Sequence, residues 1–225
     1  MLKQVRQRRS QGLFITLEGP EGSGKSTQIR FLASALRRAG YFVVQTREPG
    51  GTPLAEAMRN LLLRSSPREP IAPQTEALLI LAARGQHVAQ FIRPALERGA
   101  IVLCDRFSDS TLAYQGFGRG LNRNWLKAAN DTATEGLTPD LTILLDLPIH
   151  VGLARRRTAK GKQNRLDRES ERFHRFVRRG FLTLAKQSPR RIRIVDADRP
   201  AQDIRAELVA FVLGWARKRR RPRNR

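Results

Sequence analysis

The chain has 225 residues, of which 40% are hydrophobic, so it is long enough for one α/β domain with a buried core. No apolar run is long enough to cross a membrane, and no apolar segment precedes Gln11, so we expect neither a membrane helix nor a secretory signal. The only cysteine, Cys104, leaves no internal disulfide, which favours a reducing, cytoplasmic location.

The formal net charge of +23 is concentrated in three segments. Residues 1–9 carry four basic residues and no acidic one, and residues 217–225 carry seven basic residues and no acidic one. Residues 155–193 hold fifteen Lys and Arg against three acidic residues. We expect a basic N-terminal extension over 1–11 and a disordered basic tail over 217–225, because like charges repel and nothing in the tail can form a core.

Apolar, strand-like runs alternate along the chain with helical patterns. The runs predict strands at 13–18, 41–46, 101–104, 141–146 and 192–195. Helices are predicted near 26–39, 53–63, 74–97, 108–116, 123–135, 149–158, 168–187 and 201–216. This alternation predicts one α/β domain over 12–216, with a parallel sheet covered by helices on both faces.

The segment between the first strand and the first helix matches the phosphate-binding pattern G-x-x-x-x-G-K-[ST]. Its glycines let several backbone N–H groups point into one concavity, which suits phosphate oxygens. Lys25 can reach the β- and γ-phosphates of a nucleotide, and the Ser26 hydroxyl can ligate Mg²⁺. The predicted ATP-binding residues are Gly19, Pro20, Glu21, Gly22, Ser23, Gly24, Lys25, Ser26 and Thr27.

Ligands of such folds bind at the carboxyl ends of the strands, where three charged residues stand out. Arg47 ends the second strand and either binds a phosphate or pairs with Glu48 on the surface. Asp105 follows four apolar residues, as does the acid that assists Mg²⁺ in phosphate-loop enzymes, and Arg106 beside it can contact the transferred group. Asp146 competes for this role, but no basic residue follows it, so we prefer Asp105.

Two further basic features are site candidates. Arg84, on the helix predicted at 74–97, either holds an acceptor phosphate or is solvated, whereas His87 is interpreted as structural. The segment beginning Arg155-Arg156-Arg157 lacks apolar periodicity around 158–165 and is interpreted as a basic flap. Its arginines would stabilise the charge of a transferring phosphoryl group, the alternative being a solvated loop.

Six segments together resemble the thymidylate kinases of the nucleoside monophosphate kinase group, over about residues 12–215. These segments are 18–27, 46–52, 82–87, 105–107, 114–120 and 139–141. The resemblance implies transfer of the γ-phosphoryl group of ATP to dTMP, giving dTDP, with Mg²⁺. It also implies a P-loop nucleoside monophosphate kinase fold with a five-stranded parallel sheet, a mobile lid over about 152–168, and a homodimer.

The resemblance also assigns roles to residues. Arg47, Arg84 and Arg106 would hold the acceptor phosphate, and Asp105 would support the metal. The other residues that the resemblance places in the dTMP site are Glu48, Ile80, Ser110, Tyr114 and Gln115. Catalytic arginines would lie in the lid, as in bacterial members, and Arg155, Arg156, Arg157 and Arg165 are the candidates.

Two rival interpretations stay open. Ile80 stands where the family usually has an aromatic residue that stacks on thymine, so another nucleoside monophosphate is an alternative acceptor. The second rival is a weakly catalytic phosphate-loop protein tethered to nucleic acid by its basic tails. No aromatic residue is interspersed in the tail over 217–225, so a stacking platform for single strands is not supported.

Overall fold

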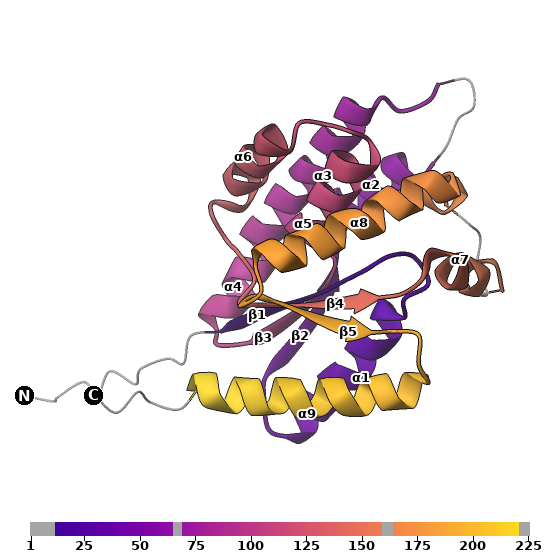
Figure 1. Cartoon of the computed structure of the whole chain (residues 1–225). Coiled ribbons are helices and arrows are strands. Elements are labelled where there is room, and N and C mark those ends of the chain that lie inside the picture. The colour runs from indigo at the N-terminus through magenta and orange to yellow at the C-terminus, as the bar shows by residue number, and fades with distance from the viewer. Residues whose placement is uncertain (1–11, 65–68, 159–163, 221–225) are drawn as a thin grey trace, which may run out of the picture.

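A computed structural model describes residues 12–64, 69–158 and 164–220. Its sheet has five parallel strands in the order β2-β3-β1-β4-β5, and all five predicted strands are present, with ends shifted by two residues at most (Figure 1). The strands are β1 (Leu13–Glu18), β2 (Val43–Arg47), β3 (Ile101–Asp105), β4 (Leu141–Asp146) and β5 (Ile192–Asp196).

The central strand β1 is buried along its whole length, which explains its almost continuous apolar sequence. The edge strands β2 and β5 are only partly buried, so they accept polar residues such as Gln45 and Arg193. Because every strand runs in the same direction, Glu18, Arg47 and Asp105 end at one edge of the sheet.

Helices α1 (Lys25–Arg38) and α9 (Ala201–Arg220) cover one face of the sheet (Figure 1). Leu32 and Leu36 of α1 pack in the same core cluster as Ile204 and Leu208 of α9. A second group of helices, long and short, covers the other face. They are α2 (Pro53–Leu63), α3 (Pro73–His87), α4 (Arg93–Glu97), α5 (Ser108–Thr111), α6 (Arg123–Thr134) and α8 (Glu171–Gln187).

Two predicted helices contain a widened π-helical turn. The helix predicted at 74–97 is α3 and α4 joined by the π-helix η1 (Val88–Ile92), and the one predicted at 108–116 is α5 continued by the π-helix η2 (Leu112–Gly118). Such turns are frequent at functional sites, because they redirect side chains within a helix.

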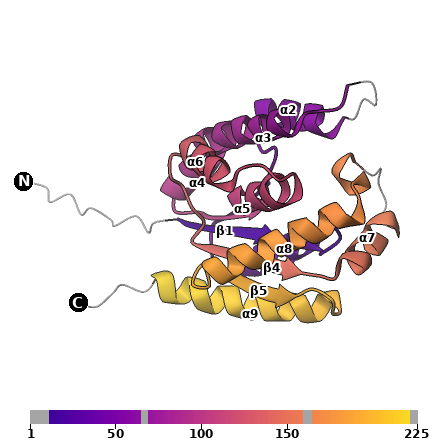
Figure 2. The same cartoon turned by 45° about the horizontal axis from the view of Figure 1, so that its top comes forward.

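The predicted lid lies at the carboxyl end of the sheet, where α7 (Ile149–Thr158) stands beside the start of α8 (Figure 2). Residues 159–163 lie outside the described part, and the chain continues through the short helix η3 (Leu166–Arg168). The backbone of α7 closely approaches the phosphate loop. A Cβ on Gly22 would overlap the backbone of Gly152, and a Cβ on Gly152 would overlap the carbonyl oxygen of Glu21.

The C-terminal boundary differs from the expected one. Helix α9 extends to Arg220, so the first four residues of the tail predicted as disordered from 217 are helical. Arg219 stabilises this extension, because its guanidinium stacks 5.2 Å from the Trp215 ring centre and lies 3.5 Å from Asp140. Residues 221–225 and the predicted extension over 1–11 lie outside the described residues. Among the helices of the described residues, none has the length and apolarity that crossing a bilayer requires.

The glycine contact between α7 and the loop generates a stability prediction. G152A will lower the free energy of unfolding by about 1–3 kcal/mol, because the new methyl group forces the two backbones apart. G214A in α9 is the matched control: its Cβ would meet open space, so it will raise the free energy of unfolding by about 0.5–1 kcal/mol. Urea unfolding measures both, and equal effects of the two variants would contradict the close approach.

Candidate functional site

The phosphate loop lies between β1 and α1, as its motif predicts. Gly22 and Gly24 have positive φ angles of 72° and 85°, which residues with a side chain rarely adopt. The glycines therefore permit the curled path of the loop backbone. Helix α1 begins at Lys25, and its first N–H groups therefore point toward the cavity that the loop encloses. The loop is thus a preformed anion site at a helix N-terminus.

Lys25 is buried and folded onto its own loop. Its Nζ donates to the carbonyl oxygens of Gly19 (3.0 Å) and Pro20 (2.8 Å) and to the Ser23 hydroxyl (3.2 Å). Burial and the nearby charge of Arg106 lower the pKa of Lys25 to about 8, although nearby carboxylates oppose the shift. A phosphate beside this ammonium would favour its charged form.

Of the two strand-end acids that the sequence offers for assisting a metal, Asp105 is the one bonded to the serine of the phosphate-loop motif. Its Oδ2 accepts a hydrogen bond from Ser26 Oγ at 2.6 Å, so the two predicted Mg²⁺ ligands adjoin at the ends of β3 and the loop. Asp146, the competing candidate, is instead bound by Arg178 through two hydrogen bonds of 2.7 and 2.8 Å.

A cavity opens above the loop and is lined by Lys25, Ser26, Thr27 and Asp105. We call it the donor cavity, after the ATP that the loop motif is predicted to bind. From the lid side, Arg155 and Arg156 line the same cavity. Arg156 is held 2.8 Å from the buried Asp167, which raises the pKa of its guanidinium. Arg157 is exposed and is not among the described residues that line this donor cavity, so the structure separates it from its two neighbours.

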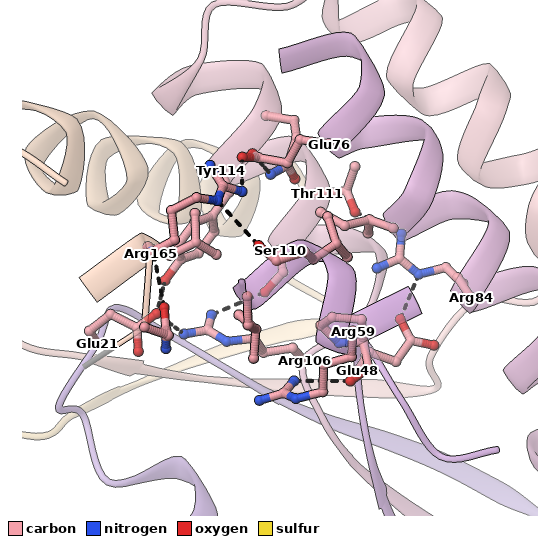
Figure 3. Close-up of a pocket in the computed structure, with 17 residues that line it drawn as sticks. Glu21, Glu48, Arg59, Glu76, Arg84, Arg106, Ser110, Thr111, Tyr114 and Arg165 are labelled. Atoms are coloured by element: carbon pink, nitrogen blue, oxygen red, sulfur yellow. Dashed lines mark hydrogen bonds and ion pairs between the residues drawn. The ribbon is translucent and has the colours of Figure 1, made fainter. Parts of the chain in front are cut away.

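A second cavity, the acceptor pocket, adjoins the donor cavity (Figure 3). The residues lining both are Glu21, Glu48, Arg59, Arg106 and Asn164. We call this shared region the junction. It is where a group leaving one cavity would enter the other.

Arg106 occupies the junction in an unusual backbone conformation. Its φ of 72° lies in the left-handed region that non-glycine residues rarely adopt. Its guanidinium donates to the Gly19 carbonyl (3.1 Å), to the Ser110 hydroxyl (3.2 Å) and to Glu21 Oε1 (2.9 Å). Arg106 therefore ties the phosphate loop to α5.

Glu21, which was predicted as part of the ATP loop, lines both cavities, and its carboxylate also binds residues of the acceptor pocket. It accepts hydrogen bonds from Arg106 and from the Tyr114 hydroxyl, both at 2.9 Å. Burial favours the neutral acid, but Arg106 and Lys25 outweigh it and hold the pKa of Glu21 at about 2. The loop thus contributes a permanent negative charge to the acceptor side.

Arg59 is a site residue that the sequence patterns did not reveal. It lies on α2, lines both cavities, and donates to the Pro49 carbonyl at 3.0 Å. Burial and the neighbouring charge of Arg47 lower its pKa. No motif surrounds it, and only the contact of α2 with the segment that follows β2 brings it to the junction.

Arg84 lies at the back of the acceptor pocket with a side chain only 2% exposed, so its alternative as a solvated residue is wrong. Its guanidinium donates to Glu48 Oε2 (2.7 Å), to Thr111 Oγ1 (2.7 Å) and to Asn130 Oδ1. Figure 3 shows the Glu48–Arg84 pair on the far side of the pocket from Glu21. Arg84 lines the acceptor pocket alone and is absent from the residues of the junction.

His87 is buried beside Glu48, as its structural interpretation predicts. Its Nδ1 lies 3.0 Å from Glu48 Oε1, and its Nε2 lies 2.6 Å from the Thr46 hydroxyl. Glu48 therefore binds Arg84 and His87 rather than Arg47. The alternative that Arg47 pairs with Glu48 on the surface is wrong, since Arg47 is bound to Glu56 at 3.0 Å and lines the donor cavity.

Ser110, Tyr114, Gln115 and Ile80, which the resemblance places in the dTMP site, all line the acceptor pocket. Tyr114 and Gln115 project from the π-helix η2, and Ile80 from α3. The Tyr114 ring lies 4.9 Å beneath the Arg106 guanidinium, so it also packs under the junction.

The segment after the lid helix also lines the acceptor pocket, through Asn164, Arg165 and Leu166. Arg165 donates to the Leu62 carbonyl at 3.2 Å and forms an ion pair with the buried Glu76 (Figure 3). Of the lid arginines left open by the sequence, Arg155 and Arg156 therefore face the donor cavity, whereas Arg165 faces the acceptor pocket.

Comparison with known proteins gives consistent matches. A family model described as thymidylate kinase matches residues 17–208. A thymidylate kinase of Thermomicrobium roseum is 54% identical over 92% of this chain and 98% of that protein, and one of Pseudomonas putida is 51% identical over 90% and 96%. The crystal structure of thymidylate kinase from Ehrlichia chaffeensis superposes with a TM-score of 0.71 at 33% identity, covering 89% of this chain and 98% of that one.

Glu18, the last residue of β1, has a perturbed carboxyl group beneath the site. It accepts hydrogen bonds from the Phe107 N–H (2.7 Å) and the Ser110 hydroxyl (2.6 Å). Burial and the charge of Asp109 raise the pKa of Glu18 from 4.5 to about 7, against the opposing effect of Arg106. The folded protein therefore favours the protonated acid. That contribution to stability is complete below pH 4.5 and is lost as the pH rises through 7.

E18Q removes this titration while keeping the shape of the side chain. The free energy of unfolding of E18Q will rise relative to the wild type by up to about 3 kcal/mol between about pH 5 and about pH 8, because only the wild type must ionise a buried acid. Urea unfolding at several pH values measures the difference. A difference that does not change with pH would contradict the raised pKa.

Proposed function

The chain belongs to the thymidylate kinase family, and we propose that its two adjoining cavities carry out the phosphoryl transfer, with ATP in the donor cavity and dTMP in the acceptor pocket. The observation that carries this assignment is the shared junction at Glu21 and Arg106. A phosphate-binding loop and a closed pocket for a second substrate meet there, as an in-line transfer between two nucleotides requires.

On the donor side, the loop N–H groups and Lys25 would bind the β- and γ-phosphates. Arg156 reaches the same cavity from the lid and is oriented by Asp167. Its fixed charge would stabilise the phosphoryl group while the lid excludes water. Asp167 keeps the guanidinium in place, so little reorganisation is needed during transfer.

We assign the metal site to Ser26 and Asp105. A hydroxyl and a carboxylate are hard oxygen donors, and their 2.6 Å hydrogen bond puts both at one point of the donor cavity, so they suit Mg²⁺. When bound, the ion would neutralise part of the charge on the phosphates.

At the junction, Arg59 and Arg106 would receive the acceptor phosphate, with Arg47 nearer the donor cavity. We reassign Arg84 from the phosphate to the base end of the pocket, because it lines the acceptor pocket and not the junction. Ile80, Thr111 and Gln115 line the same pocket and would surround the base. Tyr114 would support the sugar between these two ends.

We also propose a location and an assembly for the enzyme. A cytoplasmic location is consistent with the single, buried thiol of Cys104. The homodimer stays a prediction from the resemblance, and contact of the basic tails with nucleic acid stays a rival interpretation of their charge.

An acceptor panel tests the function. Of dTMP, dUMP, dCMP and dGMP, we expect dTMP to give the highest kcat/KM in a coupled assay of ADP formation. Ile80 supplies apolar contact to the base but no aromatic stacking, so KM for dTMP is where its effect will appear. A panel led by another monophosphate would contradict the dTMP assignment and favour the alternative acceptor.

Variants at the neighbouring positions Arg156 and Arg157 distinguish a specific catalytic role of one arginine from a general effect of a basic surface. R156A will lower kcat about 100-fold or more while changing KM for ATP only a few-fold, since its charge acts mainly on the transferring group. R157A is the matched control and will keep kcat within about twofold, because Arg157 is exposed. Steady-state kinetics decides, and equal losses in both variants would contradict this role of Arg156.

A further inference from the structure

Glu76, on α3, is a buried carboxylate that no step of the phosphoryl transfer uses. Its side chain is 1% exposed, yet it lines the acceptor pocket. Its Oε1 accepts from Gln115 Nε2 at 2.7 Å and from Arg119 Nε at 3.3 Å. Its Oε2 accepts from Arg119 Nη2 at 3.1 Å and from Arg165 Nη2. Four hydrogen bonds from three residues therefore converge on one carboxylate.

The arginines keep Glu76 ionised. Burial, the largest influence, raises its pKa, but the hydrogen bonds from Arg119 and Gln115 outweigh burial and leave the pKa below its usual value. Arg119 is itself bound to Glu169 at 2.6 Å, so two carboxylates face two guanidinium groups in this cluster. An ionised carboxylate can only accept hydrogen bonds.

This restriction determines how the Gln115 amide is oriented. Because the Glu76 carboxylate can only accept hydrogen bonds, Gln115 must turn its NH₂ group toward it. The oxygen of the same amide therefore points away from Glu76. Gln115 is buried and lines the acceptor pocket. The oxygen is thus the group that it can offer to a base, and an amide oxygen accepts a hydrogen bond but cannot donate one.

We propose that Glu76 is a positioning residue for base selection: it holds the Gln115 amide with its oxygen toward the acceptor base, so that the pocket prefers a base carrying a hydrogen on N3. Thymine and uracil have an N3–H donor, whereas N3 of cytosine is an acceptor and would face the oxygen lone pairs. The inference rests on the proposed function, since it assigns the base to this pocket. Arg119 and Arg165 act by keeping Glu76 in place.

E76Q tests the proposal, because it replaces a side chain that only accepts hydrogen bonds from Gln115 with one that can also donate to it. A glutamine at 76 can donate as well as accept, so the Gln115 amide can turn over and present its NH₂ group to the pocket. We expect the ratio of kcat/KM for dTMP to that for dCMP to fall about tenfold or more, through KM for the monophosphates, with KM for ATP unchanged.

E169Q is the matched control, because it removes the other carboxylate bound to Arg119 without touching Gln115. It will leave the dTMP to dCMP ratio within about twofold of the wild type. In a Q115L background, which has already lost the amide, adding E76Q will not lower the ratio further. A ratio that E76Q and E169Q change equally, or that E76Q leaves unaltered, overturns the role of Glu76.

Two measurements keep the outcome decisive. Circular dichroism and urea unfolding establish whether E76Q is folded, and if it is not, Q115L carries the test: a dTMP preference kept in Q115L overturns the proposal. The wild-type ratio separates the two levels of inference. A wild type that does not phosphorylate dTMP contradicts the proposed function, whereas a dTMP-preferring wild type with a ratio insensitive to E76Q contradicts only the role of Glu76.

Discussion

The ion pair between Arg106 and Glu21 is the interaction on which both halves of the site depend. It joins the end of β3 to the phosphate loop at 2.9 Å, and the same guanidinium binds the Gly19 carbonyl and Ser110. Removing either partner would leave a largely buried charge without its counterpart, which is far more costly than losing a surface pair. The loop and the acceptor pocket are therefore positioned as one unit, and the left-handed backbone at Arg106 is part of that arrangement.

The same design recurs around the pocket, where buried carboxylates hold arginines at fixed positions. Glu48 binds Arg84, and Glu76 binds Arg119 and Arg165. Such pairs contribute little net stability, because desolvation offsets most of the attraction. Their value is preorganisation: a guanidinium already desolvated and oriented needs no rearrangement when a substrate arrives.

Local patterns predicted most of the fold and the donor half of the site. The five strands, the order of helices and the phosphate loop follow from periodicity and from a motif whose residues are adjacent in sequence. Asp105 was also predictable, since strand ends meet at one edge of a parallel sheet. The acceptor half was predicted mainly by resemblance, and incompletely: Arg84 lines the acceptor pocket away from the junction, Arg59 was missed, and Glu21 lines both cavities rather than the donor cavity alone.

The sequence by itself determined that this protein has a parallel α/β sheet and a phosphate-binding loop, because those features depend on residues close together in the chain. Only the tertiary structure decided which charges pair. Glu76 meets Arg165 across 89 residues, and Arg106 meets Glu21 across 85. These residues, far apart in the sequence, are brought together by the strand order β2-β3-β1-β4-β5 and by the helices α2, α3 and α8 that lie over the sheet. No local spacing in the sequence encodes that order. A sequence pattern can therefore point to candidate arginines. Only the tertiary structure distinguishes the arginines that line the phosphate cavity from those that pair with buried carboxylates and keep the pocket in shape.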